Sequence, residues 1–64
     1  METFYVLRKN GAVKRIAKIV DNALAYAWED GQWIPMAGLL KIQNEVTDYE
    51  EISKEEAERL TRNG

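Results

Sequence analysis

Carboxylates are the residues of this chain that could do acid–base chemistry. Two neighbouring carboxylates can act as a general acid and a general base when an apolar pocket raises the pKa of one of them. Four lie close together in the sequence: Glu45, Asp48, Glu50 and Glu51. A chain of 64 residues encloses little volume for such a pocket, and the spacing differs from that of an EF-hand calcium loop. We therefore interpret this run as a solvated acidic segment.

The rest of the composition also argues against catalysis. The sequence contains no histidine and no cysteine, so the commonest general base, the commonest zinc ligands and any disulfide are missing. Its one serine, Ser53, is better explained as a helix cap. We expect a non-enzymatic protein with no catalytic residue, no cofactor and no metal site.

The sequence indicates where the protein works. It shows no signal-peptide pattern and no apolar run approaching the ~20 residues that a membrane-spanning helix needs. It also lacks the cysteines of a disulfide-stapled secreted domain. We therefore expect a cytoplasmic protein that has no membrane as a partner.

Other residues suit recognition. Basic side chains interleaved with aromatic ones on a sheet can hold single-stranded nucleic acid, and buried aromatic anchors can equally hold a protein partner. The candidate interaction residues are Lys14, Arg15, Lys18, Tyr26, Trp28 and Trp33. A sequence pI near 5.0 weighs against a phosphate partner. A third interpretation makes the three aromatic residues part of the core, with Arg15 over one ring in a cation–π contact.

Charge is divided unevenly along the chain. Residues 1–20 carry five basic residues and one acidic residue, a net charge of +4. Residues 21–64 carry four basic and ten acidic residues, a net charge of −6. Two interpretations follow: the halves attract each other within one fold or are simply solvated, or a basic face meets an anionic partner.

Turn signals indicate the elements that would position the aromatic residues. Asp30-Gly31 is a preferred type I′ hairpin turn, because both of its positions need a positive φ. This turn places Trp28 opposite Trp33, within range of a cross-strand aromatic contact. Asn10-Gly11 predicts a second hairpin, which follows a strand over residues 3–8.

Residues 12–28 fit either a helix or two strands. The apolar residues at positions 13, 16, 17 and 20 follow helical spacing. Asp21-Asn22 interrupts that stripe with two poor helix formers that favour turns. A helix would also leave the tryptophan hairpin with only one strand. We therefore favour two strands that are joined at Asp21-Asn22.

A two-residue loop at Asp21-Asn22 fixes which side chains share a face of the sheet. The expected cross-strand pairs are Ile19 with Leu24, Ala17 with Tyr26, and Arg15 with Trp28. Arg15 would then lie on the face of the tryptophans, and Lys14 and Lys18 would point to the opposite face.

Residues 53–64 give the clearest helix signal, with the helix itself predicted over 54–62. Ser53 and Glu56 fit a capping box, in which the serine oxygen accepts the N3 amide and Glu56 reaches back. Acidic residues in the first turn and arginines in the last complement the helix dipole. Asn63-Gly64 is expected to end the helix. Residues 37–52 are predicted to be a connector, acidic and turn-like over residues 45–51.

The order of these motifs resembles that of short uncharacterised proteins of bacteria and their phages. The resemblance runs through Tyr5…Gly11…Arg15-Ile16, Tyr26-Ala27-Trp28-x-x-Gly31-x-Trp33 and Ile52-Ser53-x-Glu55-Glu56-Ala57. It covers most of the chain, but its motifs are structural. It implies an α+β fold and a cytoplasmic origin, and it transfers no activity.

We therefore predict one α+β domain over residues 1–64. A small antiparallel β-meander of three to four strands over residues 3–36 packs against one short C-terminal helix. Pro35 cannot donate to a ladder, so its strand is short or lies at an edge. The helix would cover one face of the sheet and leave the other exposed.

The predicted function is a non-enzymatic protein-interaction or regulatory module of phage or mobile-element origin, binding a protein partner or a second copy as a homodimer. The alternative is a nucleic-acid-binding regulator that uses a basic and aromatic sheet face.

Overall fold

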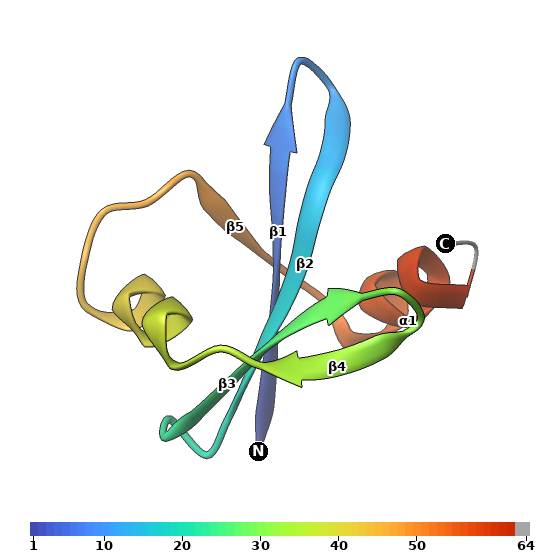
Figure 1. Cartoon of the computed structure of the whole chain (residues 1–64). Coiled ribbons are helices and arrows are strands. Elements are labelled where there is room, and N and C mark those ends of the chain that lie inside the picture. The colour runs from blue at the N-terminus through green and yellow to red at the C-terminus, as the bar shows by residue number, and fades with distance from the viewer. Residues whose placement is uncertain (63–64) are drawn as a thin grey trace.

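A five-stranded antiparallel sheet forms the centre of the computed structural model, which describes residues 1–62 (Figure 1). The strand order is β4-β3-β2-β1-β5. The elements are β1 (Glu2–Lys9), β2 (Ala12–Val20), β3 (Leu24–Glu29), β4 (Gln32–Pro35), the 3-10 helix η1 (Ala37–Gln43), β5 (Tyr49–Ile52) and α1 (Lys54–Arg62). The predicted α+β fold with a β-meander and a C-terminal helix is confirmed, with one strand more than expected. Asn63-Gly64, the expected end of the helix, lies outside the described residues.

Two hairpin turns form where the sequence predicts them. Asn10 and Gly11 have φ angles of 55° and 80°, and Asp30 and Gly31 have 51° and 79°. Positive φ at both central positions is the requirement of a type I′ turn, whose twist matches that of the flanking strands. Residues 12–20 and 24–29 are strands, so the helical alternative for this region is wrong.

The turn between β2 and β3 shifts the register from the expected one. Asp21 and Asn22 form a turn closed by a 3.0 Å hydrogen bond from the Ala23 amide to the Val20 carbonyl oxygen, but the loop contains three residues, 21–23, in place of the predicted two. Ladder pairing begins between Val20 and Leu24, so Ala23 is an extra residue. A shift of one residue moves side chains to the other face. The expected pairs are therefore wrong, and the observed ones are Ile19–Ala25, Lys18–Tyr26 and Ala17–Ala27.

A second extra residue lies in β2, opposite β1. Arg8 pairs with Val13 and Leu7 pairs with Arg15, so Lys14 is left without a partner of its own in the ladder. Such a bulge changes the alternation of the strand that carries it. Val13 and Arg15, which would share a face in a regular strand, consequently lie on opposite faces.

β5 is the strand that the sequence analysis missed. Residues 49–52 were assigned to the connector, but they pair with β1, with Tyr49 opposite Leu7 and Ile52 opposite Phe4. A strand of four residues that contains two glutamates gives little alternation to detect, and it forms because β1 offers an open edge. The first part of the connector is the 3-10 helix η1.

The core lies on both sides of the sheet, because η1 and α1 cover opposite faces (Figure 1). The expectation of one bare face is therefore wrong. Under η1, the alanines of β2 and β3 let the helix approach closely, and the buried cluster there consists of Ala17, Ile19, Ala25, Ala27 and Leu39. The buried residues on the α1 side are Phe4, Val6, Ile16 and Ala57.

The N-terminus of α1 confirms half of the predicted capping box. The Ser53 Oγ accepts a 3.0 Å hydrogen bond from the Glu56 amide. The Glu56 carboxylate accepts a hydrogen bond from Arg59 instead of reaching back to the Ser53 amide. That bond holds the pKa of the Glu56 carboxyl below its ordinary value. Among residues 1–62, no helix is long and apolar enough to cross a membrane.

Candidate interaction site

The two tryptophans form a cross-strand pair, as the Asp30-Gly31 turn predicts. Trp28 on β3 and Trp33 on β4 are direct partners in the ladder. Their ring centroids are 5.1 Å apart and their planes are inclined at 65°, an edge-to-face contact. Trp33 also lies 6.2 Å from the ring of Phe4, which is buried in the core. The pair is therefore held in place from inside the protein while both indoles remain half-buried.

Lys18 joins the aromatic residues because of the extra residue at Ala23. Its ammonium group lies 4.7 Å from the centre of the Trp33 ring and 5.4 Å from that of Tyr26. It also lies 3.2 Å from the Glu2 Oε2, and only 16% of the Lys18 side chain is exposed. A cation over two ring faces and beside a carboxylate is well stabilised. The Lys18 charge therefore already has partners within the protein.

The other two basic candidates lie elsewhere. Arg15 pairs with Leu7, which places it on the η1 side of the sheet, away from the tryptophans. Lys14 is the exposed extra residue of the bulge in β2. The structure therefore brings together four of the six candidates, Lys18, Tyr26, Trp28 and Trp33, and separates the remaining two from them.

Two further residues belong to this region, although neither was among the candidates predicted from the sequence. Glu2 supplies the carboxylate beside Lys18, and it is the only acidic residue among residues 1–20, which was the available signal. Leu24 lies two residues before Tyr26 on β3, so both point to the same face. Its side chain is 55% exposed. We call Leu24, Tyr26, Trp28 and Trp33 the aromatic face.

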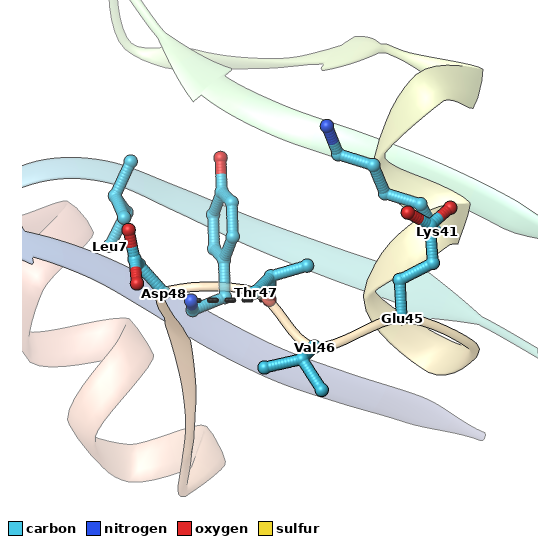
Figure 2. Close-up of a pocket in the computed structure, with 7 residues that line it drawn as sticks. Leu7, Lys41, Glu45, Val46, Thr47 and Asp48 are labelled. Carbon is cyan, nitrogen blue, oxygen red and sulfur yellow. Dashed lines mark hydrogen bonds between the residues drawn. The ribbon is translucent and has the colours of Figure 1, made fainter.

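The acidic segment borders an open hollow on the surface. A hollow of about 300 Å³ lies between η1 and the start of β5, with Leu7 at one side and Lys41 and Glu45 at the other (Figure 2). Its floor is fixed by a 3.3 Å hydrogen bond from the Tyr49 amide to the Thr47 Oγ1. Its carboxylates are exposed to solvent. Within residues 1–62, no group of three or more acidic residues is arranged to hold a metal ion.

Tyr5, on the face of the sheet opposite the aromatic face, has a shifted pKa. Burial raises the pKa of the Tyr5 phenol above its ordinary value of 10.0, and the Glu51 carboxylate raises it further. Tyr5 and Glu51 are direct partners between β1 and β5. Tyr5 is partly buried against the core under η1, so this shift arises on the face of the sheet opposite the aromatic face.

Comparisons with family models, curated proteins and solved structures found no match for this chain. Evidence on function therefore comes from the geometry of the surface itself.

Proposed function

We propose that this chain is a small non-enzymatic interaction module that binds a protein partner through the aromatic face. The observation that carries the proposal is the gathering of Tyr26, Trp28 and Trp33 on one side of the β3–β4 hairpin, next to the exposed Leu24. Tryptophan and tyrosine are the residues most enriched among those that dominate binding energy at protein interfaces.

The rigidity of the aromatic face also supports binding. Trp33 contacts Trp28 and Phe4, and Lys18 lies over the Trp33 and Tyr26 rings. Side chains that are already fixed lose little conformational entropy when a partner binds. The edge strand β4 spans only Gln32–Pro35 and ends in a proline, which is unsuited to adding another strand. The partner would therefore recognise side chains of this face in preference to the backbone edge.

The partner is a different protein or a second copy of this chain. A domain of 64 residues gains much buried area from a two-fold dimer, and an apolar patch is the kind of surface that such a dimer covers. We place the module in the cytoplasm of a bacterium or phage-infected cell. That setting rests on the order of the sequence motifs and on the absence of cysteine.

The proposal is tested with two matched variants. Leu24→Glu places a charge in the aromatic face, and Val46→Glu places the same charge at a fully exposed loop position away from it. Light scattering gives the mass of each protein in solution, and immobilised proteins are used as baits in bacterial lysate. We expect a dimer or a retained partner for the wild type and Val46→Glu, and neither for Leu24→Glu. Identical behaviour of the three proteins in both measurements would contradict the proposal.

A further inference from the structure

The β1–β2 hairpin extends beyond the rest of the sheet (Figure 1). β5 pairs with β1 only over residues 4–7, and β3 pairs with β2 only over residues 17–20. Residues 8–15 therefore pair with no third strand, and residues 8–14 are all exposed. We call residues 8–15 the basic hairpin.

The basic hairpin carries the strongest positive charge of the molecule. It contains four basic residues and no acidic residue: Arg8, Lys9, Lys14 and Arg15. Because the whole chain has a net charge of −2, the residues outside the hairpin carry −6. Within residues 1–62, the hairpin makes one ion pair, from Arg8 to Glu50 at 3.9 Å. Lys9, Lys14 and Arg15 are therefore free to bind an anion.

The cations are distributed over both faces of the hairpin. Along β1, side chains alternate, so Arg8 lies on the side of Val6 and Lys9 on the side of Leu7. Arg15 pairs with Leu7 and shares the side of Lys9. A flat acidic protein surface would contact only one of these faces. A groove between two phosphate backbones contacts both.

The composition of the hairpin selects the kind of nucleic acid. Proteins that hold single strands stack bases on aromatic side chains, and residues 8–15 contain none. The major groove of B-form DNA is about 12 Å wide and admits a two-stranded ribbon. The corresponding groove of A-form RNA is too narrow for one.

From these observations we propose that the basic hairpin is a DNA-binding arm that enters the major groove of duplex DNA. Lys9, Lys14 and Arg15 contact phosphates on both sides of the groove, and Arg8 exchanges Glu50 for a phosphate. These contacts involve the DNA backbone, so binding is independent of sequence. The acidic remainder of the molecule is repelled by the DNA and orients the hairpin toward it. The sequence pI near 5.0 averages over the basic hairpin and the acidic remainder, so it does not describe the charge of the hairpin. This function goes beyond the proposed protein contact, because it uses a different surface.

The test is fluorescence anisotropy with a labelled duplex of about 20 base pairs. With three to four phosphate contacts, affinity should fall about 20- to 50-fold between 50 and 150 mM salt. Lys14→Gln should lower the slope of log affinity against log salt by about 0.9. Lys54→Gln removes the same charge from an exposed position on α1 and should leave the slope unchanged. Leu24→Glu should also leave that slope unchanged, which separates this proposal from the protein contact.

Several outcomes would overturn the DNA-binding arm. One is the absence of duplex binding at 50 mM salt. Another is an equal effect of Lys14→Gln and Lys54→Gln, which would show that only net charge matters. Tighter binding of a single strand of the same sequence would exclude the groove. Complete displacement of the duplex by an equal charge concentration of polyglutamate would assign the hairpin to an acidic protein instead.

Discussion

The Lys18 ammonium group lies 4.7 Å from the centre of the Trp33 ring, on the same face of the sheet. The expected register had placed Lys18 on the opposite face. The contact exists because Ala23 adds one residue after the β2–β3 turn. It links the most buried cation of the candidate site to the tryptophan that also contacts the core.

The Lys18 contact predicts that the ring interaction contributes more than the ion pair. Lys18→Met keeps much of the aliphatic length and removes both, and we expect it to lower the free energy of unfolding by about 1 kcal/mol, in the range of a partly desolvated cation–π contact. Glu2→Gln removes only the ion pair, whose carboxylate partner is 37% exposed, and should cost less than about 0.5 kcal/mol. Urea denaturation of both variants measures the difference. Equal losses would show that the rings contribute nothing.

The tryptophan pair predicts a spectroscopic signature. Two indoles in edge-to-face contact at 5.1 Å couple their transitions, and we expect an exciton couplet in the far-ultraviolet circular dichroism spectrum. Trp28→Phe and Trp33→Phe should each abolish the couplet, whereas Tyr26→Phe should preserve it. A couplet that survives in either tryptophan variant would contradict the pairing of these two residues.

Turn chemistry made the hairpins predictable, because Asn-Gly and Asp-Gly are among the few pairs that readily adopt two positive φ angles. The cap of α1 was predictable for a similar local reason, the Ser53 hydroxyl. The bulge at Lys14 and the extra loop residue Ala23 were not, because an extra residue follows from the pairing of the whole ladder and leaves no local pattern. Each of these two extra residues moved a cation of the candidate site relative to the tryptophans.

β5 escaped prediction for a different reason. Its pairing with β1 joins residues that are 42 to 48 positions apart, and its two glutamates disfavour a strand locally. A short acidic strand of this kind forms only when a longer strand presents an open edge to it.

The cap of α1 predicts that removing the Ser53 Oγ lowers the stability of the protein. Ser53→Ala removes the acceptor of the Glu56 amide and should lower the free energy of unfolding by about 1 kcal/mol. For a domain of this size, that loss lowers the melting temperature by roughly 4–8 °C. Ser53→Asp supplies another acceptor and should retain most of the stability. A melting temperature unchanged in Ser53→Ala would show that the cap contributes nothing.

Tyr5 predicts a dependence of stability on alkaline pH. Its pKa is raised above 10.0 in the folded protein, so as the pH rises through that value the unfolded chain releases the proton first. The contribution of Tyr5 is therefore complete below about pH 10 and is lost as the pH rises further. The unfolding free energy of the wild type minus that of Tyr5→Phe should stay constant below about pH 10 and fall as the pH rises further. A constant or growing difference would contradict the assigned direction of the shift.

Site-specific photocrosslinking tests the aromatic face most directly. A photoreactive residue replaces Leu24 in one protein and Val46 in another, and both are irradiated in bacterial cells that express them. We predict a discrete adduct from position 24, of about twice the chain mass of 7.4 kDa for a homodimer or of another defined mass for a different protein. Position 46 should give none. The absence of an adduct from position 24, or the same adducts from both positions, would contradict a protein contact at this face.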